Sequence, residues 1–497
     1  MKTKEARLPT LSSGTRCALA ALRSNSCRRF DYLFWARATL ARAWGGGVSA
    51  PPLMAVFGGG FKRHKLSFRK TNEVSKYFPF LTINCSTCNR TSASDATICA
   101  QTVSSSTRKN VKNILFAAVL TPVALCFGLV SNASEITSAK ALKATSAVVL
   151  PAMEKNQIPG MAVALVLDDK TYIFNYGVSD VAGQSPVTDE TIFEIGSVSK
   201  TFTATLATYA EAIGKLKLTD TVAKYLPELA GTDFGNLQLL NLGTHTVGGI
   251  PLQVPDEVQN KEQLLEYFRA WKPAYKTGTM RTYANPSIGA LGWVAAKSLD
   301  KDFNTAITQT IFQPLGLFNT YLSVPAQKMT SYSWGYNKDM KAVRVNPGML
   351  DSEAYGIKTT ASDLSVFVKA NMGMLPLDST LQTALKNTRN GYFQVGKMTQ
   401  DLIWEQYVMP VDLQALEEGN SSSLILNPTP VIAKVPPSMP KSNVWVNKTG
   451  STNGFGAYVA FVPAKRFGIV LLANKNYPNA ERVEIAHKIY SELNGKQ

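Results

Sequence analysis

A serine and a lysine three residues apart, Ser197 and Lys200, are the first side chains in the sequence whose spacing could do chemistry. They open a helical pattern over residues 198–213, after an apolar approach that ends in Gly196. At a helix N-terminus, unpaired backbone N–H groups favour a developing negative charge. A lysine on the same helical face can reach the serine oxygen and lower its pKa, so the hydroxyl becomes a nucleophile without histidine. The alternative is a helix cap beside a solvated lysine, because the same spacing recurs at Ser67, Ser106, Ser298 and Ser438.

Tyr283, in the string Tyr-Ala-Asn at 283–285, could carry protons to and from that serine. A phenol has an ordinary pKa of about 10, and neighbouring lysine cations bring its phenolate within reach of neutral pH. It could then take the serine proton and later activate a water molecule. The alternative is a half-buried loop tyrosine, because the Tyr-x-Asn spacing also occurs at 477–479.

Lys448 begins a third motif, Lys-Thr-Gly-Ser at 448–451, which follows a strand-like segment at 444–446. Glycine in a strand edge lets a substrate lie alongside the backbone. The N–H of Ser451 could then pair with that of Ser197 as a two-donor site for a carbonyl oxygen. A second Lys-Thr-Gly at 276–278 lacks strand-like flanks and is interpreted as a turn.

Charge and cysteine are distributed unevenly over the 497 residues. Residues 1–133 contain 19 Lys and Arg against 4 Asp and Glu, with all six cysteines, whereas residues 134–497 contain 33 against 31 and no cysteine. The later part therefore excludes a thiol nucleophile and a cysteine-rich or three-histidine zinc site, so no metal is expected. Its two histidines, His245 in a turn and His487 in a helical pattern, are interpreted as structural rather than catalytic. Its near-neutral charge removes the reason to expect nucleic acid as a partner.

Residues 108–133 are interpreted as a secretory signal, with a basic start, an apolar run at 114–130 and small residues at 131–133. The alternative is a membrane anchor, which a 17-residue run containing Pro122 and lacking a basic flank argues against. Residues 1–107 are rich in arginine and serine. They are interpreted either as a transit or membrane-proximal segment or, preferably, as an extension outside the mature protein. We therefore expect a periplasmic protein from residue 134 onward, without stable membrane insertion.

From residue 134 the patterns predict an α/β fold. The patterned segments are a helix at 136–154, strands at 161–166 and 171–176, strands at 455–462 and 467–472, and a helix at 480–493. Strands at both ends predict one antiparallel sheet formed from both chain ends and flanked by helices. The α/β body is expected at about 134–215 and 301–497, with an inserted, mainly helical lobe at about 216–300.

The three motifs, taken in order, resemble those of the penicillin-recognising serine enzymes: β-lactamases, penicillin-binding DD-peptidases and related esterases. The tyrosine motif combined with Lys-Thr-Gly is similar to class C β-lactamases, since class A enzymes carry Ser-Asp-Asn at that place and class D enzymes another pattern. Longer stretches that resemble the family lie at 158–163, 193–203, 252–258, 345–348, 354–356 and 472–479. The resemblance covers 136–497 and departs at His245, where a tyrosine is expected.

The resemblance implies a β-lactamase/DD-peptidase-like fold and a role for each matching residue. Ser197 would be the acylated nucleophile, with Lys200 and Tyr283 handling its proton and Lys448 tuning the tyrosine. The residues implied for substrate binding are Gln253 and Asn285 at the amide side chain, Ser451 at the carbonyl oxygen, Thr449, Asn479 and Arg482 at the carboxylate, and Tyr355 as a wall.

The expected activity is that of a class C serine β-lactamase, which hydrolyses cephalosporins and penicillins in two steps without a metal or cofactor. The protein is expected to work as a monomer on this small-molecule substrate. The alternatives are a DD-peptidase or serine esterase on the same scaffold, or a β-lactam sensor that is acylated and stalls. These proteins differ in how well the acyl-enzyme is hydrolysed, which sequence motifs do not measure.

Overall fold

The computed structural model describes residues 137–495, which belong to one compact unit. The expected secretory signal at 108–133 and the extension at 1–107 lie outside these residues. Within residues 137–495, none of the helices combines the length and the apolar character needed to cross a membrane.

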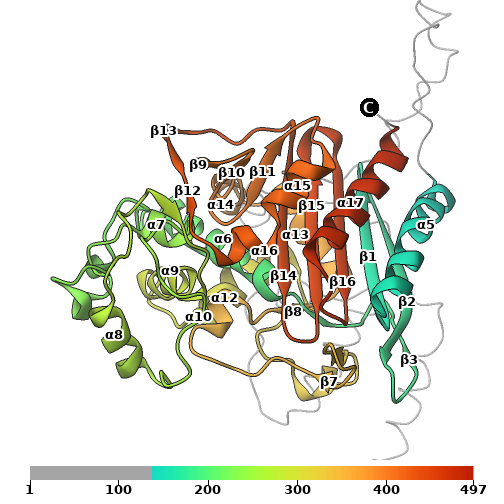
Figure 1. The fold of residues 1–497 in the computed structure, drawn as a ribbon, viewed down its shortest axis with the longest axis horizontal. Helices are drawn as coiled ribbons and strands as arrows, with labels where there is room; N and C mark the ends of the chain where they lie inside the picture. Colours follow the sequence, from blue (N-terminus) through green and yellow to red (C-terminus); the bar gives the residue numbers. More distant parts are fainter. Residues whose placement is uncertain (1–136, 496–497) are drawn as a thin grey trace, which may run out of the picture. The chain divides into compact units, whose positions relative to one another are not determined.

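A ten-stranded antiparallel sheet runs through the molecule in the order β13-β9-β10-β11-β14-β15-β16-β1-β2-β3 (Figure 1). Near one edge, β1 (Gly160–Leu167) lies between β2 (Lys170–Asp180) and β16 (Phe467–Ala473), so the two chain ends pair directly. The reversal between β1 and β2 includes Asp168 at a φ of 51°, a left-handed conformation that aspartate tolerates. The prediction of one sheet built from both chain ends is confirmed.

Most of the other half of the sheet comes from residues in which the sequence showed no strand pattern, although residues 444–446 were expected to be strand-like. Its strands are β9 (Gly391–Val395), β10 (Met398–Gln400), β11 (Glu405–Val408), β13 (Ile432–Ser438) and the motif strand β14 (Val444–Ser451), which pairs with β15 (Gly456–Val462). Three of them span five residues or fewer, so no alternation of apolar and polar residues could become visible. Pairing with neighbouring strands determines their conformation.

Helices cover both faces of this sheet, and β1 shows why. All eight of its residues are buried, with Ala162 and Val166 in one apolar cluster and Val163 and Leu165 in the other. The first cluster lies against α6 (Ser199–Ala212) and α13 (Ala361–Asn371), and the second against α5 (Ser138–Asn156) and α17 (Asn479–Asn494). A strand apolar on both faces is typical of a sheet buried between two layers of helices.

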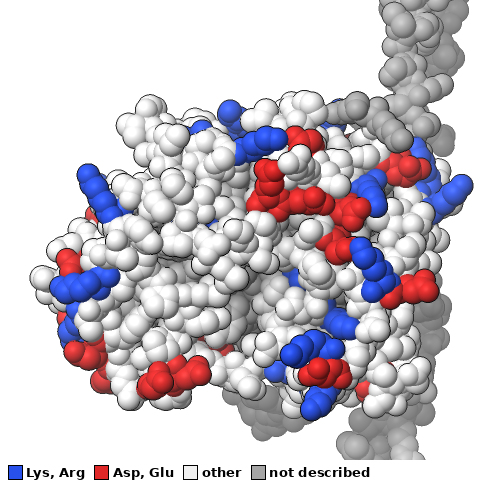
Figure 2. Space-filling model, in the orientation of Figure 1, with Lys and Arg blue, Asp and Glu red and all other residues white. Residues whose placement is uncertain are grey.

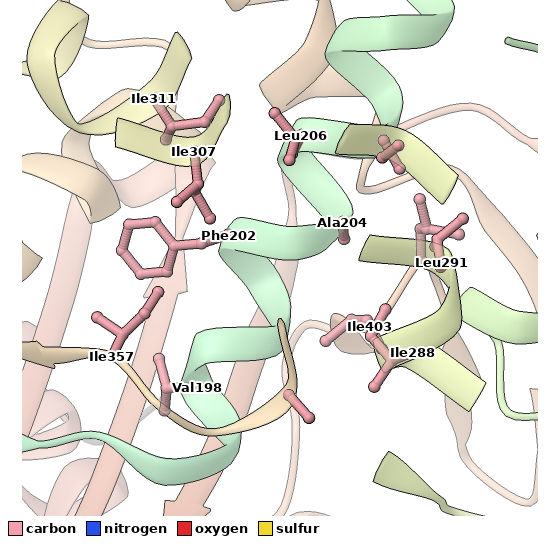
Figure 3. Close-up of a cluster of buried hydrophobic side chains, with 14 of the residues drawn as sticks. Val198, Phe202, Ala204, Leu206, Ile288, Leu291, Ile307, Ile311, Ile357 and Ile403 are labelled. Carbon is pink, nitrogen blue, oxygen red and sulfur yellow. The ribbon is translucent and has the colours of Figure 1, made fainter. Parts of the chain in front are cut away.

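The central helix, α6, is buried over almost its whole length. Phe202 stacks on Phe367 of α13 with ring centroids 3.8 Å apart, and Figure 3 shows Phe202 and Leu206 among side chains from surrounding segments. The hydroxyls of Thr205 and Thr208 donate to carbonyls one turn back, which satisfies polar groups that water does not reach. Lys200, in the first turn of α6, is therefore placed inside the protein rather than in solvent.

Residues 216–300 contribute α7 (Leu239–Gly243), α8 (Lys261–Ala270) and α9 (Asn285–Ser298) and, among the described residues, no strand of the large sheet. The remaining helices are α10 (Phe303–Ile307), α11 (Gln313–Leu315), α12 (Asp351–Ala354), α14 (Ser379–Asn387), α15 (Leu413–Gly419) and α16 (Ser422–Leu426). The remaining strands are β3 (Ser185–Pro186), β4 (Phe193–Glu194), β5 (Met280–Arg281), β6 (Gly335–Tyr336), β7 (Ala342–Val343), β8 (Lys358–Thr359) and β12 (Thr429–Pro430).

Charged side chains of both signs share the face drawn in Figure 2. Acidic side chains gather over α15 and α17, with lysines and arginines beside them. On this face the described residues form no continuous basic stripe. This distribution agrees with the near-balance of charges that the sequence shows beyond residue 133.

Candidate active site

One cleft of about 740 Å³ brings together nine of the eleven expected site residues. The nine that line it are Ser197, Gln253, Tyr283, Asn285, Tyr355, Lys448, Thr449, Ser451 and Asn479. Lys200 lies just behind the lining, and Arg482 lies within the protein. Residues separated by up to 282 positions in the chain thus meet at one site.

Ser197 lies in a 3₁₀ turn, Gly196–Val198, directly before α6. This turn packs against the end of β14, and two glycines make the approach possible. A Cβ on Gly450 would come within 2.0 Å of the Ile195 carbonyl oxygen, and one on Gly196 would come within 2.5 Å of the Ser451 nitrogen. Gly196 also has a φ of 49°, which favours glycine. The backbones of Ser197 and Ser451 therefore lie side by side.

The motif on β14 has a strand partner on one side only. Pairing with β11 ends where Glu405 lies opposite Asn447, whereas pairing with β15 continues through Ser451. The segment from Lys448 to Ser451 consequently presents an edge without a strand to the cleft and to the Ser197 turn. An extended substrate can lie along such an edge.

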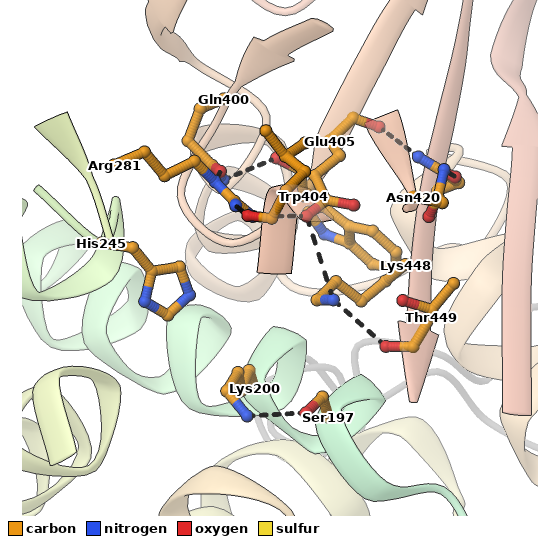
Figure 4. A network of polar contacts seen from close by, with 12 residues as sticks. Ser197, Lys200, His245, Arg281, Gln400, Trp404, Glu405, Asn420, Lys448 and Thr449 are labelled. Atoms are coloured by element: carbon orange, nitrogen blue, oxygen red, sulfur yellow. Dashed lines mark hydrogen bonds and ion pairs between the residues drawn. The ribbon is translucent and has the colours of Figure 1, made fainter. Parts of the chain in front are cut away.

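Lys200 is fully buried, and its ammonium group points at the serine. Its Nζ donates to Ser197 Oγ at 2.9 Å (Figure 4), and it also donates to the Ala354 carbonyl at 2.9 Å. Burial disfavours the charged form and lowers the pKa of Lys200 to about 8, although Tyr283 opposes this change. A lysine with such a pKa can accept and release a proton near neutral pH.

Tyr283 lies in the segment between β5 and α9, and its ring is surrounded by cations. The Nζ atoms of Lys200 and Lys448 each lie 5.1 Å from the ring centre, and Arg281 Cζ lies 5.4 Å from it. Burial alone would raise the pKa of this phenol, but the two lysines outweigh burial and lower the pKa to about 8. The geometry thus supplies a second group that exchanges a proton near neutral pH.

Glu405 provides the negative charge beside these cations, and the sequence analysis did not identify it. Its Oε1 accepts from Arg281 Nη2 at 2.9 Å and lies 4.0 Å from Lys448 Nζ, with both pairs buried. Arg281 also donates to Gln400, as Figure 4 shows. Buried cations without such a partner would be strongly destabilising. No spacing signal in the sequence marks a glutamate on a short central strand as a member of the site.

Asn285 and Gln253 are joined at the helical side of the cleft. Asn285 Nδ2 donates to Gln253 Oε1 at 2.8 Å, and the Asn285 N–H donates to the Leu252 carbonyl at 2.8 Å. Asn285 Oδ1 is buried without a hydrogen-bond partner among residues 137–495, so it can accept from a ligand N–H. On the far side, Asn479 Nδ2 donates to the Asn420 carbonyl at 3.1 Å.

Arg482, which was expected to face a substrate carboxylate, lies behind the cleft lining. Its side chain is fully buried and does not line the cleft. Its Nη1 donates to the Gly450 carbonyl at 2.7 Å and to Ser451 Oγ at 3.0 Å, and its Nη2 to Asn476 Oδ1 at 2.7 Å. These bonds hold Nη1 and Nη2 of the guanidinium within the protein, while Nε has no hydrogen-bond partner among the described residues. Arg482 thus supports the motif strand from behind.

No group of three or more His, Asp or Glu side chains in residues 137–495 has the arrangement of a metal site. His245 and His487 lie apart: His245 beside Tyr283, and His487 on α17 with Nε2 at 3.3 Å from the Val411 carbonyl.

Glu194, three residues before Ser197, connects separate parts of the cleft and was also missed by sequence analysis. Its Oε1 accepts from Tyr332 Oη at 2.5 Å and from the Val345 N–H at 2.8 Å, while its Oε2 accepts from Thr452 Oγ1 at 2.6 Å. Val345 and Thr452 both line the cleft. One buried carboxylate therefore fixes two lining segments relative to the Ser197 turn.

Replacing Glu194 tests this role. In Glu194→Leu the Val345 N–H loses its acceptor, so we expect the free energy of unfolding to fall by about 1–3 kcal/mol. Hydrogen exchange at Val345 should also accelerate. Glu194→Gln keeps an acceptor of the same shape, so its free energy of unfolding should fall by less than half as much as that of Glu194→Leu. Urea unfolding and hydrogen exchange measure both effects, and a Glu194→Leu protein as stable as wild type would contradict the assignment.

Comparisons with known proteins agree with this geometry. A family model described as Beta-lactamase matches residues 145–493. A beta-lactamase of Pseudomonas fluorescens is 51% identical over 343 residues, covering 69% of this chain and 96% of that protein, and one of Escherichia coli K12 is 45% identical over 346 residues, covering 69% and 92%.

Solved structures agree as well. A class C beta-lactamase in complex with cefoxitin is similar with a TM-score of 0.70 and 50% identity, covering 71% of this chain and 99% of that one. A protein described as beta-lactamase/D-alanine carboxypeptidase from Pseudomonas syringae has a TM-score of 0.70 and 50% identity, covering 72% and 99%. With the family model matching well over half of its length and these relatives sharing its fold, the chain belongs to the beta-lactamase family, in its class C.

Proposed function

We propose that this protein hydrolyses the amide bond of β-lactams, cephalosporins and penicillins, through an ester formed on Ser197. The observation that carries the proposal is the position of Ser197 beside two groups with a pKa of about 8, Lys200 and Tyr283. Such groups can both remove and return a proton at neutral pH. The similarity to a class C enzyme in complex with cefoxitin supports this class of substrate.

In the first step, Ser197 Oγ attacks the lactam carbonyl carbon while its proton passes to the pair formed by Lys200 and Tyr283. The N–H groups of Ser197 and Ser451 hold the carbonyl oxygen as it becomes negative. The pair then returns the proton to the lactam nitrogen as the carbon–nitrogen bond breaks. The product is an open-ring ester of Ser197.

In the second step, water replaces the serine. The Tyr283 phenolate takes a proton from the water, whose oxygen attacks the ester carbonyl carbon. The proton then goes to Ser197 Oγ as the ester bond breaks, which regenerates the free serine. Lys448, 5.1 Å from the tyrosine ring, favours the phenolate by its charge.

The lining residues orient the substrate for this attack. Asn285 and Gln253 hold the amide side chain, because Asn285 Oδ1 is free to accept from it. Thr449 and Asn479 face the carboxylate, and Tyr355 forms a wall. Arg482 has no direct contact in this scheme and acts by supporting Gly450 and Ser451.

Tyr283→Phe tests the proton role. We expect kcat to fall by about 10²–10⁴-fold, the usual contribution of general acid–base catalysis, while the buried ring keeps the fold intact. In wild type, kcat/KM should fall as the pH drops below about 8, because protonation of the Lys200–Tyr283 pair removes the base. Stopped-flow kinetics across the pH range measure both.

The matched control is Tyr490→Phe, which removes a buried phenol oxygen on α17 outside the cleft. It should leave kcat and the pH profile unchanged. If Tyr283→Phe retained a near-normal kcat, Lys200 would be the working base and the tyrosine would serve only in packing.

Turnover of a chromogenic cephalosporin tests the reaction itself. We expect multiple turnovers by wild type, a β-lactam adduct on the intact protein by electrospray mass spectrometry, and no adduct on Ser197→Ala. EDTA and a thiol reductant should have no effect on the rate, because residues 134–497 contain no cysteine and the mechanism uses no metal. An adduct that forms and persists without turnover would instead indicate a sensor.

Peptidase activity is a second candidate, because one similar structure is described as a D-alanine carboxypeptidase from Burkholderia cenocepacia, with 48% identity and a TM-score of 0.69. The same acyl-enzyme chemistry would release D-alanine from a peptide ending in D-Ala-D-Ala. Comparing kcat/KM for such a peptide, a simple ester and the cephalosporin ranks the alternatives. Faster hydrolysis of the peptide than of the cephalosporin would replace the main proposal.

We further propose that residues 108–133 act as a secretory signal and that the mature protein is a periplasmic monomer beginning near Ser134. The family match, which begins at residue 145, supports this boundary. A chain starting at Ser134 should fold and keep kcat/KM within about tenfold of the full chain, which corresponds to about 1.4 kcal/mol. Kinetic assays of the purified shortened protein test its activity, and size-exclusion chromatography tests whether it is a monomer. A larger loss of activity would make the earlier residues part of the enzyme.

A further inference from the structure

His245 follows α7 in a tight turn and holds the backbone on both sides of Tyr283. Its carbonyl oxygen accepts from the Thr282 N–H at 2.8 Å, and its Nδ1 accepts from the Ala284 N–H at 3.3 Å. The residues before and after Tyr283, the proposed proton carrier, are therefore both hydrogen-bonded to His245. The backbone of His245 is left-handed, with a φ of 59°, a conformation that costs about 1–3 kcal/mol in a non-glycine residue.

The imidazole also packs on the side chain of Tyr283. The two ring centres are 4.4 Å apart at an angle of 44°, and His245 is only 1% exposed. Its Nε2 has no hydrogen-bond partner among the described residues. The imidazole ring thus packs on the phenol ring of Tyr283, and its Nδ1 lone pair accepts the hydrogen bond from the Ala284 N–H.

The surroundings keep this imidazole neutral. Burial is the main cause of a His245 pKa well below its ordinary value, and the charges of Arg281, Lys200 and Lys448 act in the same direction. Because Nδ1 accepts from the Ala284 N–H, the single ring proton belongs on Nε2. The nearby Ser287 hydroxyl, 3.2 Å from Nδ1, also donates to the Ala284 carbonyl at 3.0 Å. Protonation of Nδ1 would remove the acceptor and add a fourth cation beside the phenol.

We propose that neutral His245 is a positioning residue that fixes the backbone and ring of Tyr283 so that the ring stays beside the ammonium groups of Lys200 and Lys448. The inference rests on the proposed function, in which Tyr283 moves protons to and from Ser197. His245 itself does not line the cleft, and it reaches the lining through its contact with Tyr283. Its effect on the reaction is transmitted through Tyr283.

Two variants of similar shape distinguish the effect of losing the hydrogen-bond acceptor at position 245 from the effect of changing the side-chain volume. Asparagine places Oδ1 where histidine has Nδ1, so His245→Asn keeps an acceptor for the Ala284 N–H and tolerates the left-handed backbone. His245→Leu has the same branching without an acceptor. We expect His245→Leu to lose about 10- to 100-fold in kcat, since small displacements of catalytic groups have such effects, and His245→Asn to stay within about fivefold of wild type.

A readout that does not depend on turnover follows the Tyr283 phenol directly. Carbon-13-labelled tyrosine, assigned by comparison with Tyr283→Phe, reports its titration by NMR. In His245→Leu the phenol moves away from the lysines, so its pKa should rise by about one unit or more, whereas His245→Asn should keep the wild-type titration. If β-lactam turnover were absent from wild type, the proposed function would fail while this titration would still test the positioning role.

His487→Leu is the matched control, because it removes a histidine on α17 that contacts the Val411 carbonyl. It should change neither kcat nor the Tyr283 titration. Thermal unfolding identifies the variants that are folded at the assay temperature. The proposal is overturned if folded His245→Leu keeps the wild-type kcat and titration, or if Asn and Leu at this position lose kcat equally.

Discussion

Three cations surround the ring of Tyr283 at the buried wall of the cleft, and one carboxylate, Glu405, accompanies them. In water these charges would be screened and the phenol would keep an ordinary pKa. Inside the protein, the lysines lower the pKa of Tyr283 while burial lowers that of Lys200, so both come to about 8. This match depends on the exclusion of water by the surrounding layers of helices and strands.

The large sheet and α6 hold the lysines around Tyr283 in fixed, buried positions. Lys448 is held on β14 and Lys200 on α6, two elements buried on nearly every side. Gly196 and Gly450 allow the turn that carries Ser197 to touch the strand that carries Lys448. A lysine on a flexible loop would move into solvent and regain its ordinary pKa, so rigid placement is part of the chemistry.

Around the cleft, buried polar groups act on the lining residues from behind. Arg482 holds the Gly450–Ser451 end of β14, Glu194 joins the segments around Val345 and Thr452, and His245 straddles Tyr283. Each of these side chains is almost completely buried and satisfies backbone groups that would otherwise be unpaired. Their contribution is to the geometry of the cleft, which explains why motifs centred on the lining residues do not include them.

The sequence by itself determined the three motifs, the two hairpin-like strand pairs near the chain ends and the helices that begin and end the domain. These are local patterns: an apolar run such as β1, or a serine and lysine one helical turn apart, is visible within a dozen residues. It did not reveal β9, β10 and β11, whose conformation depends on pairing with β14, nor the burial of Arg482. Glu405 and His245 gain their roles only when strands and turns distant in sequence pack around Tyr283. The tertiary structure decided these because a pKa and a hydrogen-bond partner depend on neighbours in space, which linear spacing does not specify.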